Sequence, residues 1–143
     1  MKIVEDSLEI YRIQGQGYAP LISYHGWRVA AACFAPHLTP ERLPHFEKHL
    51  KTDEVFIPIW AGGLLYLAGR GEKPGEISVH PMSQGEICNV RCGTWHAISL
   101  EPESSVVIVE NDDTSEDNTL RQPLEEWQRK SVIQLAREVM GDR

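Results

Sequence analysis

Apolar residues in this chain gather in short runs, and glycine, proline and polar residues separate one run from the next. Short runs rich in branched and aromatic residues, with turn signals between them, are typical of the strands of a β-sandwich or β-barrel. The pattern therefore predicts eight to ten short strands, most of them in a barrel over about residues 20–110. The runs lie at 8–13, 21–24, 27–35, 54–60, 64–68, 76–80, 86–91, 95–100 and 105–110, with an extended approach from about His45.

The run at 54–60, EVFIPIW, has the clearest strand character. Successive side chains of a strand point to opposite faces, so we expect one face to carry Glu54, Phe56, Pro58 and Trp60. Proline has no N–H for a sheet ladder, which predicts an unpaired side or a bulge at Pro58. Residues 61–63 then predict a turn, and 64–68 a hairpin partner for this strand.

The C-terminal part has a different pattern. Residues 111–122, NDDTSEDNTLRQ, are polar and predict a loop. From Pro123 to about residue 140, apolar residues recur on one broad side of a helix, and Gly141 ends the pattern. We expect this amphipathic helix, at about 123–140, to pack on the barrel or on a second subunit. A homodimer is a corresponding expectation, because exposed edge strands need cover.

Length and charge narrow the class of protein. A chain of 143 residues suits one domain with its own core, here residues 1–143. The formal charge of −7 argues against a nucleic-acid binder and against attachment to anionic membranes. No apolar run approaches the roughly 20 residues of a membrane span, and the first residues do not resemble a signal peptide. Three cysteines without framework spacing indicate free thiols and a cytoplasmic protein.

Two stretches carry histidines at a recognisable spacing. In the first, His49 is followed by four residues and then Glu54, and Gly62 closes the run. In the second, Gly85 is followed by seven residues, Gly93, two residues and His96. These stretches resemble the two motifs of the cupin superfamily, and the resemblance implies a close relationship to its small bacterial single-domain members. The resemblance covers residues 45–100 and implies an all-β double-stranded β-helix, or jelly roll, with one C-terminal α-helix.

Three positions depart from the cupin pattern. Glu47 stands where the first motif has another histidine, Arg91 where the second has a proline, and Leu100 where an asparagine often follows. The resemblance therefore implies a metal centre with an altered ligand set. It does not identify a reaction, because this fold carries many unrelated functions.

The resemblance implies that His49, Glu54 and His96 meet inside the barrel and bind a divalent ion. Two imidazoles and one carboxylate suit zinc, iron, manganese or nickel. Glu47 is the candidate for a fourth ligand or a catalytic base. Candidate pocket-lining residues are Phe56, Trp60, Tyr66 and Ile98.

Some alternatives stay open at this point. His45 could replace Glu47 as a ligand from a loop. The same histidines could instead make structural hydrogen bonds, with Glu54 paired to Arg28 or Lys51, and the barrel would then hold a metal-free pocket. The expected function is accordingly a metal-dependent isomerase, lyase or dioxygenase acting on a small polar metabolite. The alternative is a non-catalytic cupin module that binds a small ligand.

Overall fold

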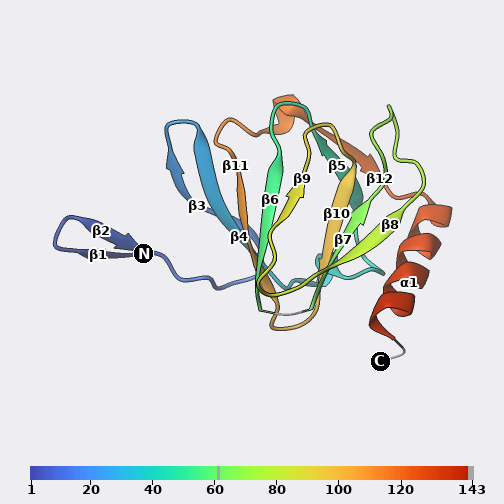
Figure 1. Cartoon of the computed structure of the whole chain (residues 1–143), viewed down its shortest axis with the longest axis horizontal. Helices are drawn as coiled ribbons and strands as arrows, with labels where there is room; N and C mark the ends of the chain where they lie inside the picture. The colour runs from blue at the N-terminus through green and yellow to red at the C-terminus, as the bar shows by residue number, and fades with distance from the viewer. Residues whose placement is uncertain (61, 142–143) are drawn as a thin grey trace.

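A computed structural model describes residues 1–60 and 62–141, and its main body is two five-stranded antiparallel sheets laid face to face (Figure 1). The first, called here the β5–β10 sheet, has the order β12 (Thr119–Pro123), β5 (His45–His49), β10 (His96–Leu100), β7 (Gly63–Leu67), β8 (Ser78–Met82). The second, the β4–β11 sheet, has the order β3 (Gly17–Tyr24), β4 (Trp27–Cys33), β11 (Ser105–Asn111), β6 (Glu54–Trp60), β9 (Cys88–Val90). The predicted all-β jelly roll with one C-terminal helix is confirmed.

Apolar side chains from both sheets fill the space between them. Phe56 and Ile108 come from the β4–β11 sheet, and Leu65 and Leu100 from the β5–β10 sheet. Each follows the period-two alternation of its strand, so neighbouring residues face outward. This inner core occupies one part of the barrel, and the remaining part is a cavity lined by both polar and apolar side chains.

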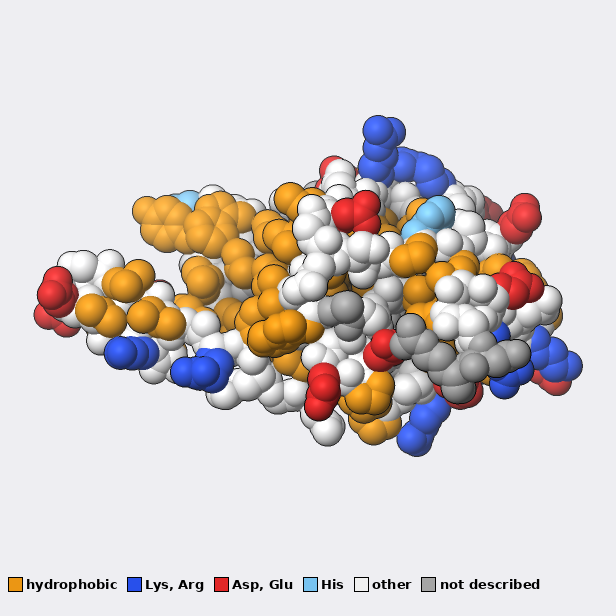
Figure 2. Space-filling model, turned by 60° about the horizontal axis from the view of Figure 1, so that its bottom comes forward, with side chains coloured by type: hydrophobic (Ala, Val, Ile, Leu, Met, Phe, Trp, Pro, Cys, Tyr) orange, Lys and Arg blue, Asp and Glu red, His pale blue; other side chains and the backbone are white. Residues whose placement is uncertain are grey.

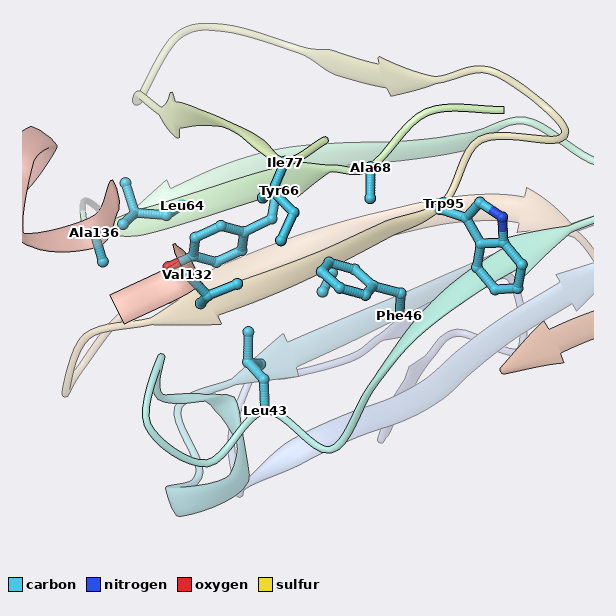
Figure 3. Close-up of a cluster of buried hydrophobic side chains, with 10 residues drawn as sticks. Leu43, Phe46, Leu64, Tyr66, Ala68, Ile77, Trp95, Val132 and Ala136 are labelled. Carbon is cyan, nitrogen blue, oxygen red and sulfur yellow. The ribbon is translucent and has the colours of Figure 1, made fainter. Parts of the chain in front are cut away.

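A second core lies on the outer face of the β5–β10 sheet, under helix α1 (Glu126–Met140) (Figure 3). Phe46 and Tyr66 of the sheet are fully buried there against Val132 and Ala136 of the helix. Burying a large side chain contributes about 1.5–3 kcal/mol. The expectation that the helix packs on the barrel is confirmed. None of the helices in the described part of the chain is long and apolar enough to span a bilayer.

The predicted hairpin between 54–60 and 64–68 is wrong. β6 pairs with β11 and β9, whereas β7 pairs with β10 and β8 in the opposite sheet. The connection between them therefore crosses from one sheet to the other. Gly62 has a φ of 107°, a backbone conformation that favours glycine. Residue 61 of the predicted turn lies outside the described residues.

The strand pairing around Pro58 accommodates a residue that has no backbone N–H. β9 pairs only with the first part of β6, up to Phe56, and a register shift on the β11 side falls between Ser105 and Val106. Opposite this shift, β6 has one extra residue between Pro58 and Trp60. The predicted unpaired side or bulge at Pro58 is confirmed.

The polar segment 111–122 was expected to be a loop, but it contains a short helical turn η2 (Glu116–Asn118) and most of β12. Ser115 and Asn118 cap the turn, and β12 then pairs along the whole of β5. β12 is held mainly by backbone pairing with β5, so it has few apolar residues. Its hydrophobic pattern therefore does not predict a strand.

A small hairpin precedes the barrel and projects away from it (Figure 1). It consists of β1 (Lys2–Val4) and β2 (Leu8–Ile10), where the sequence predicts a single strand at 8–13. Glu5 and Asp6 connect the strands with φ values of 54° and 51°. Positive φ at both central residues is the geometry of a tight hairpin turn.

Candidate metal centre

Strand β5 carries three polar residues of the site on its inward face. Phe46 points outward into the helix-covered core, so the alternate residues His45, Glu47 and His49 face the interior of the barrel. Glu54 then begins β6, in the opposite sheet, with its side chain only 8% exposed. The first motif thus reaches the site from two sheets.

Backbone contacts hold the second motif against the first. Gly93 has a φ of 85°, and its N–H donates to the carbonyl oxygen of His49 at 2.8 Å. The adjacent N–H of Cys92 donates to the Asp53 carboxylate at 2.7 Å. This turn delivers His96 at the start of β10, with its side chain 4% exposed. The structure therefore brings His49, Glu54 and His96 together.

Glu54 lies between the two imidazoles. Its Oε2 is 3.1 Å from Nε2 of His49, and its Oε1 is 2.9 Å from Nε2 of His96. The two rings lie 5.2 Å apart between centroids. All three groups are buried, so each polar atom depends on the others for a partner.

The other nitrogen of each ring is also held. Nδ1 of His49 lies 2.9 Å from Oγ1 of Thr119, and Nδ1 of His96 lies 2.9 Å from the carbonyl oxygen of Thr94. A carbonyl accepts, so Nδ1 of His96 carries a hydrogen. Nε2 of the same ring lies against the Glu54 carboxylate, so a hydrogen is required between these two atoms when no cation is present.

The acid–base properties agree with this geometry. Burial lowers the pKa of His96, but the hydrogen bond and the charge of Glu54 outweigh burial and raise it. For Glu54, burial raises the pKa, and the hydrogen bonds from His49 and His96 bring it well below its ordinary value.

Glu47 lies near both histidines of the site, whereas His45 contacts Glu47. An oxygen of Glu47 and one ring nitrogen each of His49 and His96 all lie within 4.8 Å of one another. Nε2 of His45 is instead 3.3 Å from Oε1 of Glu47, and Nε of Arg121 donates to the same oxygen at 3.0 Å. Burial raises the pKa of Glu47, but the His45 hydrogen bond and nearby positive charges lower it. His45 and Arg121 thus orient the Glu47 carboxylate.

Sequence reasoning missed Glu110 as part of this site. It lies on β11, with its side chain 3% exposed, and its Oε1 accepts hydrogen bonds from Tyr18 at 2.9 Å and Arg28 at 2.7 Å. Arg28 thus pairs with Glu110 and not with Glu54. Burial and the neighbouring Glu54 raise the pKa of Glu110 to about 7. A signal for it exists in the sequence, because Glu110 continues the inward-facing alternation of Val106 and Ile108.

The site opens into a cavity of about 600 Å³ between the sheets. Phe56 and Ile98 line it, as predicted, together with polar side chains of β5, β10 and β12. Trp60 does not line the cavity: it is 54% exposed, because the bulge after Pro58 breaks the alternation of β6. Tyr66 does not line it either, since it faces helix α1 and its hydroxyl is 2.8 Å from that of Ser99.

The donor set fits a divalent ion. Both imidazoles direct Nε2 toward the Glu54 carboxylate, an oxygen of Glu47 lies within 4.8 Å of one nitrogen of each ring, and each imidazole is fixed through Nδ1. Metal-binding histidines are commonly held in this way by a partner on the other ring nitrogen. Imidazole and carboxylate together suit zinc, iron, manganese or nickel.

No protein-family profile matches the sequence, and no curated protein matches it. Among solved structures, the chain is similar to a variant of the Streptomyces protein PAC13 solved with uridine. The identity is 9%, the TM-score is 0.54, and the alignment covers 87% of this chain and 98% of that one. The capsular polysaccharide assembling protein CapF from Staphylococcus aureus aligns at 18% identity and a TM-score of 0.53, over 76% of this chain and 32% of that one.

An oxalate decarboxylase of Bacillus subtilis aligns at 16% identity and a TM-score of 0.49, over 71% of this chain and 25% of that chain. The chain thus spans a third or less of the length of CapF and of the decarboxylase. Likenesses at these identities establish the fold alone.

Proposed function

The chain has the cupin fold of these neighbours, and we propose that it is a divalent-metal-dependent enzyme acting on a small polar metabolite. The carrying observation is the pair of contacts made by His96, whose two ring nitrogens both face acceptors. In the absence of a metal, the buried Nε2 position needs a proton. A divalent ion fits the same position, because it satisfies the imidazole and the carboxylate together.

In this proposal the protein ligands are His49, His96, Glu54 and Glu47. When bound, a divalent ion supplies Lewis-acid polarisation to a carbonyl, carboxylate or hydroxyl oxygen of the substrate. Thr119 and the Thr94 carbonyl fix the two rings. His45 and Arg121 fix the Glu47 carboxylate and lower its pKa, so it stays ionised. An ionised carboxylate of lowered pKa serves better as a metal ligand than as a proton acceptor.

The cavity indicates the substrate class. Its volume of about 600 Å³ suits a small metabolite, and its polar groups surround the ligand set while Phe56 and Ile98 supply an apolar wall. Such a wall excludes water from one side of a bound molecule and limits how it can lie. The reaction expected at such a centre is an isomerisation, a lyase cleavage or an oxidation.

Metal binding is tested first, on protein purified without a chelator or an affinity tag. Wild type, His96→Ala and a control, His80→Ala, are melted with each of manganese, iron, cobalt, nickel and zinc. His80 is an exposed residue of β8, outside the cavity. At an ion concentration about a hundred times the dissociation constant, the wild type and the control should melt about 5–10 °C higher. His96→Ala should show no such rise. An equal rise in all three proteins, or none, would contradict the proposal.

Catalysis is tested next, by following pools of small hydroxy, keto and carboxylic acids by NMR. A metal-loaded wild type that consumes a component, with His96→Ala inactive, supports an enzyme. The second candidate, a metal-free binding module, is favoured by one observation: Glu54 and the two imidazoles satisfy one another without an ion. Ligands that raise the melting temperature equally with and without chelator would select that module.

A further inference from the structure

Glu110 has one carboxylate oxygen that nothing in the described structure satisfies. Oε1 accepts from both Tyr18 and Arg28, whereas Oε2 is buried and has no hydrogen-bond partner. Leaving a buried acceptor unpaired destabilises the fold, and more so when the acceptor is charged. In the metal-free protein, a proton shared with Glu54 is the partner available to this oxygen, and a cation bound between the two carboxylates would take the place of that proton.

The surroundings of this oxygen point to a cation. One carboxylate oxygen of Glu110, one of Glu54 and one ring nitrogen of His49 lie within 4.8 Å of one another, and all three residues are buried. Two carboxylates at this distance repel each other unless they share a proton or a cation lies between them. Arg28 approaches Glu110 from the other side, through Oε1.

Tyr18 and Arg28 hold the carboxylate in this orientation. Glu110 on β11 is directly paired with Arg28 on β4, so strand register fixes the ion pair. The two hydrogen bonds to Oε1 restrict rotation of the Glu110 carboxylate. They keep Oε2 directed away from Tyr18 and Arg28. Hydrogen bonds behind a ligating carboxylate usually have this role at metal sites.

We propose that Glu110 is an additional ligand of the metal ion, so that this chain holds the ion with three carboxylates and two imidazoles. The inference rests on the proposed metal centre and extends its ligand set beyond the two motifs. A carboxylate-rich set favours manganese or iron(II) over zinc relative to a set with more imidazoles. Glu110 then adds a carboxylate ligand to a centre that has Glu47 in place of a motif histidine.

The test compares wild type, Glu110→Gln and a control, Glu86→Gln, by titration with manganese and with zinc. Glu86 is exposed and outside the cavity. Glutamine keeps the size of the side chain and its contact with Arg28 but removes the charge. We expect manganese affinity to fall by more than tenfold in Glu110→Gln, zinc affinity to fall less, and the control to match wild type.

Cobalt absorption spectra separate a ligand from a residue that only positions one. A lost ligand changes the coordination number, so the visible bands of cobalt-loaded Glu110→Gln should differ in intensity from those of wild type. Unchanged manganese affinity, or weaker affinity with an unchanged cobalt spectrum, would overturn the inference while leaving the proposed function in place. A wild type that binds no ion would overturn both. Glu110→Asp, which retains the charge, replaces glutamine if that variant does not fold.

A second, independent inference concerns the N-terminal hairpin. Its strands pair with each other, and it carries exposed Ile3, Leu8 and Ile10, at 57%, 52% and 45% exposure. An isolated two-stranded hairpin is marginally stable in water. Figure 2 shows apolar side chains on the projecting hairpin and on the neighbouring end of the barrel. A groove of about 490 Å³ lies between them, lined by Ile3, Asp6, Ser7, Leu8, Glu9 and Ile22.

The charges along the hairpin are complementary to those of a second copy. Lys2 lies at the start of β1, and Glu5 and Asp6 lie at the opposite end, in the turn. An antiparallel two-fold arrangement places Lys2 of one copy near the acidic turn of the other, twice per dimer. It also places the partner's hairpin beside β3, which is the edge strand of its sheet.

The geometry points to a homodimer in which the hairpin of each copy lies in the hairpin–β3 groove of the other. Sedimentation equilibrium tests this with Ile3→Asp and a matched control, Ile87→Asp, whose side chain is 70% exposed outside the groove. We expect dimers for wild type and the control, and a dissociation constant at least tenfold higher for Ile3→Asp. Lys2→Glu should weaken the dimer, and Glu5→Lys combined with it should restore the dimer. A monomeric wild type, or an Ile3→Asp dimer of unchanged stability, would overturn the inference.

Discussion

At the scale of single residues, the proposed centre depends on how each ligand is held from behind. His49 is held by Thr119, His96 by the Thr94 carbonyl, and Glu47 by His45 and Arg121. None of these supports belongs to the two sequence motifs except Thr94. The ligands are thus set in place by contacts that the motif spacing does not contain.

Replacing Thr119 by valine tests the support of His49. The change removes the hydroxyl beside Nδ1 and keeps the shape, so the ring is no longer held in orientation. We expect the affinity for the preferred ion to fall by about 10–100-fold, with the circular dichroism spectrum unchanged. Thr94→Val is the control, because its hydroxyl accepts a hydrogen bond from Arg70, at 3.5 Å, and the carbonyl that holds His96 is retained. An affinity of Thr119→Val within twofold of wild type would show that the hydroxyl has no such role.

Glu110 makes stability depend on pH in the metal-free protein. Its pKa is raised to about 7 by burial and by Glu54, whereas an unfolded glutamate has its ordinary value of 4.5. The folded state therefore binds this proton more tightly. The resulting stabilisation is complete below the unfolded pKa and is lost as the pH rises through the folded pKa.

Glu110→Gln cannot lose this stabilisation. In chelator at pH 8, we expect the variant to be more stable than wild type by about 1–3 kcal/mol, and the difference to approach zero below about pH 5. Urea unfolding at the two pH values measures it, with Glu86→Gln as the control. A variant that is less stable than wild type at pH 8 would contradict the assignment of the raised pKa to Glu110.

At the scale of elements, helix α1 closes the outer face of the β5–β10 sheet, and this is the sheet that carries three of the proposed ligands on its inner face. Val132 is fully buried against that sheet, whereas Val139 of the same helix is 42% exposed. The helix thus stabilises the sheet from the side opposite to the site, without touching the ligands.

The same substitution at these two positions separates packing from helix propensity. Val132→Ala should lower the free energy of unfolding by about 1–3 kcal/mol, because it leaves a cavity in the core. Val139→Ala should change it by less than about 0.5 kcal/mol. Urea denaturation measures both, and metal affinity should be unchanged in either variant. Equal effects at the two positions would show that the helix is not held by this face.

Some strands of this fold are predictable from the sequence pattern, and others are not. Strands such as 54–60 and 105–110 are predictable because burial imposes their apolar pattern. Residues 119–123 are not, because backbone pairing with β5 holds them and leaves no apolar signature. The partner of β6 was mistaken because a turn signal at 61–63 does not reveal whether the chain returns to the same sheet. The place of Trp60 was mistaken because one bulge reverses which face it occupies.

At the scale of the whole molecule, two motifs about forty residues apart converge because the fold lays one sheet over the other. The resemblance of the two motifs to those of cupins predicts that His49, Glu54 and His96 meet. Glu110, Tyr18 and Arg28 come from strands outside the motifs. Their approach is fixed by the registers of β3, β4 and β11, which only the assembled fold reveals.

The central claim is that one divalent ion lies among these side chains, and anomalous diffraction from crystals of metal-loaded protein tests it most directly. Data collected on both sides of the absorption edge of the bound element locate it without reference to activity. The account predicts a single peak inside the barrel, about 2.0–2.3 Å from the nearest atoms of His49, Glu54 and His96. The absence of a peak there, or a peak only at exposed histidines such as His25 or His80, would contradict it.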